Sequence, residues 1–191
     1  QDQAAPFRLL SRVMEQLSPQ PAEWMKPGKP TRVSIEDVRD IPTLEFPYGT
    51  LPVIHASAGV KRILGLACLL VWAWYEHTHA ARLLNQTPTD QLVLLVDKVE
   101  SHLHPRWQRS ILPAILNVST GLQASVSTQV MATTHVPLIL ASVETLFDPD
   151  QDRLFLFDLA EQGVTLAPVS WAKQGDTVEV VILNIDPDNK R

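Results

Sequence analysis

Apolar residues recur along the first half of the chain at spacings that predict helices separated by short extended pieces. Residues 4–17 carry apolar side chains at helical spacing and predict an amphipathic helix. Residues 18–30 hold four prolines and one glycine and predict a loop, and residues 31–52 read as extended pieces broken by prolines and Gly49. Residues 59–84 predict a long helix, apolar on nearly every face through its first half, which is typical of a helix buried in a larger core.

In the second half, apolar runs of strand length alternate with helical patterns. Residues 92–96 form an unbroken apolar run before Asp97, which favours a central parallel strand covered on both faces. Pro105 suits the first position of a helix, and Pro113 predicts a kink in it. Residues 126–134, 153–157 and 164–169 predict strands, the last two joined by a turn at Gly163, and residues 136–143 predict a short helix. The alternation predicts an α/β layer fold.

Composition narrows the class of protein. Hydrophobic residues make up 45% and charged residues 19%, as in ordinary folded proteins, and the formal net charge is −5 with scattered Lys and Arg. This argues against a large nucleic-acid-binding face on this chain, although a partner could supply one. The single cysteine, Cys68, lies in an apolar run and predicts a buried thiol in a reducing compartment. Residues 63–75 are too few to span a bilayer, so we expect a cytoplasmic protein without a membrane segment.

Two segments carry oxygen or N–H groups suited to phosphate and its counterion. Ser57, Ala58 and Gly59 begin the long helix, where a hydroxyl and exposed N–H groups form an anion site, although Ser57 would also serve as an ordinary helix cap. Asp97 follows an apolar strand, which is where open α/β sheets place ligands, and Lys98 comes next. A strand-end aspartate also occurs without any function.

Two further segments carry histidines. Glu100 is followed by the loop residues Ser101, His102, Leu103 and His104, and Pro105 then starts a helix. Because Glu100, His102 and His104 alternate, an extended loop would also let them bind a transition metal, but no Cys or further acid is spaced to complete that site. The strand at residues 126–134 ends in two threonines before His135, which is either a functional group or a structurally satisfied histidine.

These four segments, in this order, resemble the C-terminal half of an ABC-type ATPase head, of the RecF, OLD-nuclease and structural-maintenance-of-chromosomes group of AAA-type ATPases. The resemblance implies a P-loop NTPase-type layered α/β fold with a mostly parallel sheet. It also implies one ATPase lobe over residues 1–191, with a signature helix (56–85), a Walker B strand and D-loop (91–105), a switch-histidine strand (126–137) and C-terminal strands with a tail (152–191).

The same resemblance implies roles for single residues. Ser57, Ala58 and Gly59 would meet the γ-phosphate of ATP held by an opposite subunit. Asp97 would hold Mg²⁺ through its water shell, and His135 would contact the γ-phosphate. Residues 101–104 would lie at a dimer interface as the D-loop. ATP and Mg²⁺ are therefore the expected cofactors.

Lys98 is the main departure from the family pattern. The family has a glutamate at this position that orients and deprotonates the attacking water. A lysine ammonium has no acceptor at neutral pH and cannot take that proton, but it can pair with the γ-phosphate. We therefore expect that nucleotide is bound and turned over slowly or not at all.

No phosphate-binding loop of the form Gly-x-x-x-x-Gly-Lys-Ser/Thr occurs in these residues, and the sole Gly-Lys pair, Gly28 with Lys29, precedes a proline. We expect the chain to be a fragment, to have lost this lobe, or to receive it from another polypeptide. Two hypotheses remain open. The chain is half of an ATPase that closes as a dimer, or with a complementary lobe, and drives a nuclease or other DNA-related effector; alternatively, it is a hydrolysis-deficient module that senses nucleotide.

Overall fold

The computed structural model describes residues 5–19, 21–122, 126–160, 163–170 and 179–184. Contacts between Cα atoms divide the chain into two units. The first consists of Gln1–Thr89 with His102–His104, and the second consists of Asp90–Ser101 with Pro105–Arg191. Each unit is described by itself.

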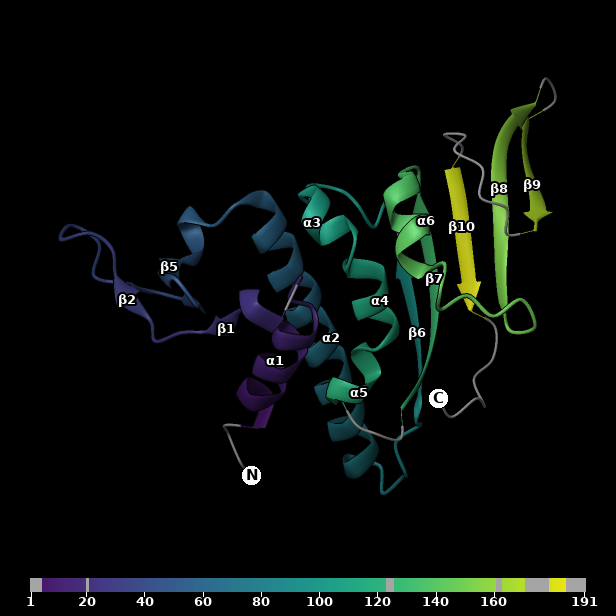
Figure 1. Ribbon diagram of the computed structural model, residues 1–191. Coiled ribbons are helices and arrows are strands. Elements are labelled where there is room, and N and C mark those ends of the chain that lie inside the picture. Colours follow the sequence, from purple (N-terminus) through teal and green to yellow (C-terminus); the bar gives the residue numbers. More distant parts are fainter. Residues whose placement is uncertain (1–4, 20, 123–125, 161–162, 171–178, 185–191) are drawn as a thin grey trace. The chain divides into compact units, whose positions relative to one another are not determined.

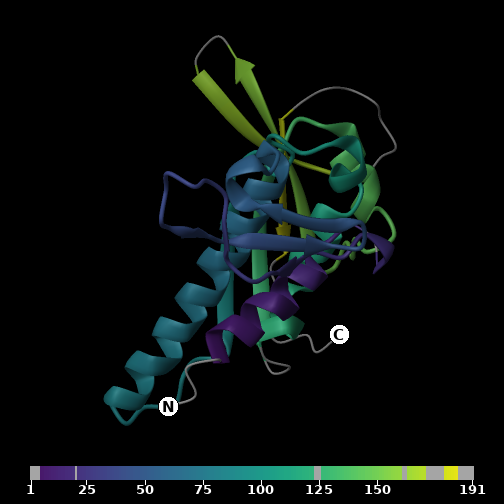
Figure 2. The ribbon, with the colours of Figure 1, turned by 90° about the vertical axis from the view of Figure 1, so that its left-hand side faces the viewer.

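Two α-helices form the core of the first unit. Helix α1, Ala5–Gln16, packs against helix α2, Ala58–Leu83, and both views show the two helices side by side (Figures 1 and 2). Val13 and Met14 of α1 are fully buried, which explains the helical spacing of apolar residues in this segment. The predicted helix at residues 4–17 is confirmed over its described part.

Short strands fill the segment between these helices. Strands β1 (Lys26–Pro27), β4 (Thr43–Phe46) and β5 (Gly49–Pro52) form an antiparallel sheet in the order β1-β4-β5. Strands β2 (Thr31–Arg32) and β3 (Asp40–Ile41) form a separate pair, and short 3-10 helices lie at Pro21–Glu23 and Val53–His55. The predicted extended pieces are confirmed, whereas the predicted loop at residues 18–30 contains β1 and the first 3-10 helix.

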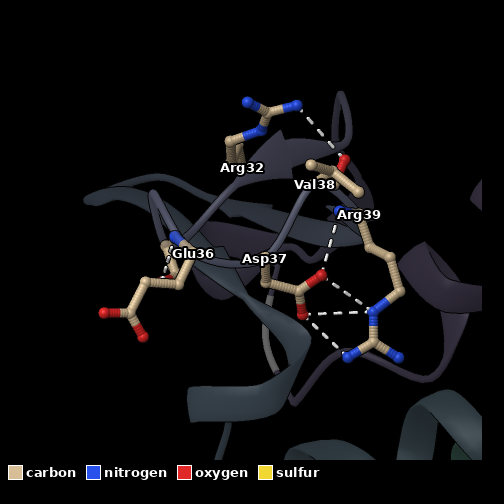
Figure 3. Close-up of polar contacts among 6 residues, drawn as sticks. Arg32, Glu36, Asp37, Val38 and Arg39 are labelled. Atoms are coloured by element: carbon tan, nitrogen blue, oxygen red, sulfur yellow. Dashed lines mark hydrogen bonds and ion pairs between the residues drawn. The ribbon is translucent and has the colours of Figure 1, made fainter.

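The connection between β2 and β3 is held by local polar contacts (Figure 3). The Arg39 guanidinium donates to both carboxylate oxygens of Asp37, at 2.7 to 3.1 Å, and the Arg39 backbone N–H donates to the same carboxylate. These bonds lower the pKa of Asp37 and raise the pKa of Arg39. Arg32 donates to the carbonyl of Val38. Ile35, in the same connection, is 96% exposed. The ion pair between Asp37 and Arg39 is exposed, so it orders the connection locally and contributes little to the stability of the fold.

Helix α2 is only partly covered. Its 26 residues end before Asn85, whose φ of 53° is the left-handed conformation common just after a helix. Ile63, Ala67 and Leu70 are buried, but Leu69 and Trp72 are 70% and 67% exposed. The expectation of a helix buried on nearly every face is therefore wrong for the described residues. Cys68 is exposed too, because it lies on the uncovered face, so the predicted buried thiol is also wrong.

One helix in the described part of the chain, α2, is long and apolar enough by length and composition to cross a membrane. The prediction from residues 63–75 alone understated this, because the helix continues at both ends of that run. Core helices of soluble proteins pass the same test, so the length of α2 assigns it no membrane role.

The second unit is built on a mixed sheet in the order β6-β7-β10-β8-β9, whose strands run side by side in Figure 1. The strands are β6 (Gln91–Val96), β7 (Ser127–Thr134), β8 (Asp152–Ala160), β9 (Gly163–Val169) and β10 (Glu179–Asn184). Only β6 and β7 pair in parallel, and the other pairs of this sheet are antiparallel. The prediction of a mostly parallel sheet is therefore wrong for the described residues, whereas the mixed α/β class is confirmed.

Strand β6 lies at the edge of this sheet rather than in its centre. Alternate side chains along it are exposed, including Val93 at 56% and Leu95 at 75%. The prediction of a central strand covered on both faces is therefore wrong for the described residues, because β6 is an edge strand and the side chains on one of its faces are exposed.

Four short helices complete the second unit. They are α3 (Pro105–Gln108), α4 (Ile111–Leu116), α5 (Val118–Leu122) and α6 (Pro137–Val143). Helix α4 packs on β7 and α6, with Ile111 and Ile115 buried. The predicted single helix after Pro105 is interrupted around residues 109–110 and at Asn117. Pro113 lies in the first turn of α4, and the helical run is broken one turn before it, where a proline removes a backbone hydrogen bond and crowds a carbonyl. The disturbance predicted at Pro113 is therefore a break in the helix rather than a kink. Helix α6 and the strands after it appear as predicted, and residues 171–178 and 185–191 of the expected tail lie outside the described residues.

Candidate functional site

The parallel pairing of β6 and β7 places Asp97 beside the end of β7. Val96 is in register with Ala132, so Asp97, which follows β6, and Thr133, which is the next to last residue of β7, lie at the same end of the sheet. The Thr133 hydroxyl donates to Asp97 Oδ1 at 2.6 Å. The exposed carboxylate is thereby held in one orientation at the carboxyl end of two parallel strands, where open α/β sheets bind their ligands.

The turn after Asp97 is tied to β7 by its backbone. The Lys98 N–H donates to the Thr133 hydroxyl at 2.8 Å, and the Val99 N–H donates to the Thr133 carbonyl at 3.1 Å. Lys98 has a φ of 47°, a left-handed conformation that is uncommon outside glycine. The side chain of Val99 is buried, which fixes the turn, while that of Lys98 is exposed.

Glu100 is buried and contacts two residues at the end of β7. Its side chain is 5% exposed. The Thr134 hydroxyl donates to Glu100 Oε2 at 2.6 Å and accepts from the Val136 N–H at 3.1 Å. The other oxygen, Oε1, lies 2.8 Å from Nδ1 of His135, outside good hydrogen-bond alignment. The imidazole of His135 is 58% exposed, so one of its nitrogens faces a buried carboxylate and the ring borders solvent.

In the first unit, Ser57 is the N-cap of α2. Its hydroxyl oxygen accepts from the Val60 N–H at 3.3 Å, and the Ser57 carbonyl accepts from the Lys61 N–H. The Lys61 ammonium donates to the carbonyl of Ile54 at 3.0 Å, which adds a positive charge to this helix start. Ala58 is exposed as the first helical residue. The capping role of Ser57 is therefore established by geometry, and an anion site at the same helix start is compatible with it.

Gly59 lies against the loop at His102–His104, within the same unit. A Cβ at Gly59 would stand 2.8 Å from the carbonyl oxygen of His102, which is closer than Cβ atoms approach an oxygen. His102 has a φ of 62°, Leu103 is buried, and His102 and His104 are exposed. The glycine is therefore required by the close approach of this loop to the start of α2.

The metal-binding alternative finds no support in the described residues. No group of three or more His, Cys, Asp or Glu in that part of the chain could hold a metal ion. Glu100 contacts Thr134 and His135, and the left-handed backbone at His102 interrupts the extended alternation on which the alternative depended.

The structure thus forms two groups from the residues singled out in the sequence. Asp97, Lys98 and His135 gather around the ends of β6 and β7, and Gly59 meets His102 and Leu103 at the start of α2. Sequence reasoning gave no role to Thr133 and pointed to Glu100 only as a candidate metal ligand. The signal that points to both is the parallel pairing, because it places the two threonines before His135 beside Asp97 and Glu100.

The fold is similar to that of a solved Smc head. The solved structure is described as the SmcHead bound to the C-winged helix domain of ScpA, and the TM-score is 0.51 at 16% sequence identity. The similarity covers 88% of this chain and 43% of that chain. At this identity the similarity establishes the fold alone.

Two relatives are described as retron ATPases. The chain is 28% identical over 100 residues to the retron Ec83 probable ATPase of Escherichia coli, and 35% identical over 51 residues to the retron Vc95 probable ATPase of Vibrio cholerae serotype O1 biovar El Tor. These alignments cover 50% and 27% of this chain. They span only 16% and 9% of the lengths of the two relatives.

A family model matches residues 17–141, which is more than half of the chain and includes both groups of site residues. The family is described as an AAA domain, putative AbiEii toxin of a type IV toxin–antitoxin system. The chain belongs to this AAA-domain family.

Proposed function

We propose that the chain forms the part of an ATPase that contacts the γ-phosphate and Mg²⁺, and that it closes as a homodimer, or with a complementary lobe, around ATP. The observation that carries this proposal is the meeting of Asp97, Thr133 and His135 at the carboxyl ends of two parallel strands. We also infer that both units are parts of one ATPase lobe, because the family match runs across both.

The donor set at this sheet end fits Mg²⁺. Asp97 offers an exposed carboxylate and Thr133 a hydroxyl, and hard oxygen ligands are those that Mg²⁺ prefers. Asp97 would hold the ion through its waters, and Thr133 would keep the carboxylate oriented. When bound, Mg²⁺ neutralises charge on the phosphate oxygens.

The start of α2 would contact phosphate held by an opposite subunit. The Ser57 oxygen accepts from Val60, so its hydroxyl hydrogen is suited to donate to a phosphate oxygen. Gly59 lets His102 and Leu103, of the loop at residues 101–104, lie close to this helix start. We infer that this loop acts as a D-loop and forms part of the dimer interface.

Lys98 favours the second candidate function, a module that binds nucleotide without turning it over. Its ammonium can pair with phosphate but offers no lone pair to accept the proton of an attacking water. In either case we propose that closure around nucleotide acts on a partner effector, and that this effector is DNA-related.

The proposal is tested by ATP binding and hydrolysis in the full-length assembly that contains this chain. Asp97→Asn should weaken binding of Mg²⁺-ATP by about tenfold or more, since one charge-assisted ligand contact is lost. Lys98→Glu should raise turnover by about a hundredfold, the usual gain from a positioned general base. Lys98 is exposed, so Lys98→Glu should change the free energy of unfolding by less than about 0.5 kcal/mol. Asp97→Asn keeps an oxygen that accepts from the Thr133 hydroxyl and should lower the free energy of unfolding by less than about 1 kcal/mol.

Two results would contradict the proposal. Undiminished Mg²⁺-ATP affinity in Asp97→Asn would exclude Asp97 from the metal site. If the wild-type assembly hydrolyses ATP rapidly and Lys98→Glu leaves the rate unchanged, then Lys98 does not impair turnover. Dimer closure is tested separately by sedimentation with and without Mg²⁺-ATP, where the dimer should form only with nucleotide.

A further inference from the structure

We propose that Glu100 is a positioning residue for His135, which it orients by Nδ1 so that Nε2 is the nitrogen presented to the nucleotide. This inference rests on the proposed function for the nucleotide role of His135. It adds Glu100 to the site and assigns a role to each ring nitrogen of His135.

The contacts of Glu100 are what single it out. A buried carboxylate is costly unless polar groups surround it. Here Oε2 accepts from the Thr134 hydroxyl at 2.6 Å, and Oε1 lies 2.8 Å from His135 Nδ1, although the two are not well aligned for a hydrogen bond. Its neighbour Val99 is fully buried, and Lys98 and Val99 are tied to Thr133 by backbone hydrogen bonds. The carboxylate is therefore held on both sides by elements that leave it little freedom to move.

The position of this carboxylate decides which nitrogen of His135 carries the proton. An ionised carboxylate only accepts hydrogen bonds, and Oε1 lies 2.8 Å from Nδ1, so we infer that Nδ1 carries the proton and that a small rotation of the ring aligns the two groups. Nε2 then has a lone pair when the ring is neutral and a second N–H when the ring is charged. Because Nδ1 faces the buried Glu100, Nε2 diverges from it on a ring that is 58% exposed.

This arrangement makes Glu100 act through His135 rather than on nucleotide directly. The carboxylate is 5% exposed and its Oε2 already accepts from Thr134. The pair has the same logic as the carboxylate that orients a histidine in other active sites, where loss of the carboxylate leaves the wrong tautomer. Glu100 is thus distinct from the water-activating glutamate that the family has at position 98.

The direct test is the tautomer of His135, read from two-bond ¹H–¹⁵N correlation spectra of the full-length assembly with ¹⁵N-labelled histidine. The His135 signals are assigned by their loss in His135→Ala. In the wild type, Nδ1 should carry the proton. In Glu100→Gln, whose side chain has nearly the same shape, the carboxamide can donate, so the proton should move to Nε2. Glu144→Gln makes the same chemical change in the same unit and should leave the His135 signals unchanged.

The nucleotide readout is a double-mutant cycle on ATP affinity. Glu100→Gln should weaken Mg²⁺-ATP binding by about tenfold, the loss expected for one hydrogen bond to a charged group. Glu100→Gln should have no further effect in a His135→Ala background, because Glu100 acts only through that ring. Additive losses in the double variant would overturn the positioning role.

The two proposals fail in different ways. A wild-type His135 that is protonated at Nε2, or a tautomer that Glu100→Gln leaves unchanged, overturns the positioning role whatever the nucleotide affinity. This wild-type measurement needs no variant to fold. The expected tautomer and its loss in Glu100→Gln, together with unchanged ATP affinity in His135→Ala, support the pairing but overturn the nucleotide role of His135.

Discussion

Thr133 connects the two strands that form the candidate site. Its hydroxyl donates to the carboxylate of Asp97 and accepts from the Lys98 N–H. One side chain therefore supplies a hydrogen bond to the carboxylate and another to the backbone of the turn. This double use explains why the turn tolerates a left-handed lysine, since the conformation is held by contacts on both sides.

Thr133→Val should destabilise the protein by about 2 kcal/mol, because it removes a hydrogen bond to a charged group and leaves a backbone N–H without its acceptor. Urea unfolding followed by circular dichroism measures the change. Thr133→Ser keeps the hydroxyl, so its free energy of unfolding should fall by less than about 1 kcal/mol. Equal losses in the two variants would mean that the methyl group, not the hydroxyl, is responsible.

Cys68 gives a pH-dependent prediction at the same scale. The thiol is exposed at its surface, yet neighbouring atoms desolvate it and raise its pKa. The folded state therefore favours the neutral thiol. This contribution to stability is complete below the ordinary pKa of cysteine and is lost as the pH rises through the raised value.

Alkylation of Cys68 by iodoacetamide should go to completion. Its rate should rise with pH, and the midpoint of this rise should lie above that of a free cysteine peptide, because the thiolate is the nucleophile. Mass spectrometry of samples quenched across a pH series measures the rate. A midpoint at or below that of the peptide would contradict the raised pKa.

Helix α2 contains two glycines in different surroundings, which makes a matched comparison at the scale of one element. A Cβ at Gly59 would meet the carbonyl of His102 at 2.8 Å, whereas a Cβ at Gly65 would meet no atom within 4 Å. Helix propensity favours alanine over glycine at both positions, so only the steric surroundings differ.

Gly65→Ala should therefore stabilise the protein by about 0.5–1 kcal/mol. Gly59→Ala should destabilise it by about 1–2 kcal/mol, because the loop at His102 must move away. Thermal unfolding of the two variants beside wild type measures both signs. Stabilisation by Gly59→Ala would show that the loop does not pack on the helix start.

At the scale of the whole molecule, apolar surface remains uncovered in both units. Leu69 and Trp72 of α2 and Val93 and Leu95 of β6 are more than half exposed. An edge strand with exposed apolar side chains is prone to pair with other copies. This chain spans a small part of the length of its retron relatives.

The isolated chain should self-associate in a concentration-dependent way, and Leu95→Lys should reduce this association by about tenfold by placing a charge on the exposed face of β6. Light scattering across a concentration series measures it. Gln91→Lys adds the same charge on the same exposed face where no apolar side chain is removed, and should have a smaller effect. Equal effects of the two lysines would assign the association to net charge rather than to apolar contact.

The pattern of apolar residues was sufficient to predict α1, α2, β6, β7, α6, β8 and β9, because each is defined by its own period and by prolines or glycines at its ends. The break after Pro105 into three helices was predicted only in part, because Pro113 indicates a disturbance one turn before it, whereas the second interruption at Asn117 has no such local signal. Strand β10 was missed as well, and its pairing between β7 and β8 is a long-range contact.

By itself, the sequence determined the class of fold, the family, and the order of the segments with Ser57, Asp97 and His135, because these are properties of local pattern and spacing. Tertiary structure alone decided that β6 is an edge strand, that Cys68 and Leu95 are exposed, and that Thr133 and Glu100 complete the site. The physical reason is that burial and hydrogen-bond partners depend on which strands pair and in what register. A residue that contacts a partner more than thirty positions away, as Glu100 does with Thr134, carries no local signal of that contact.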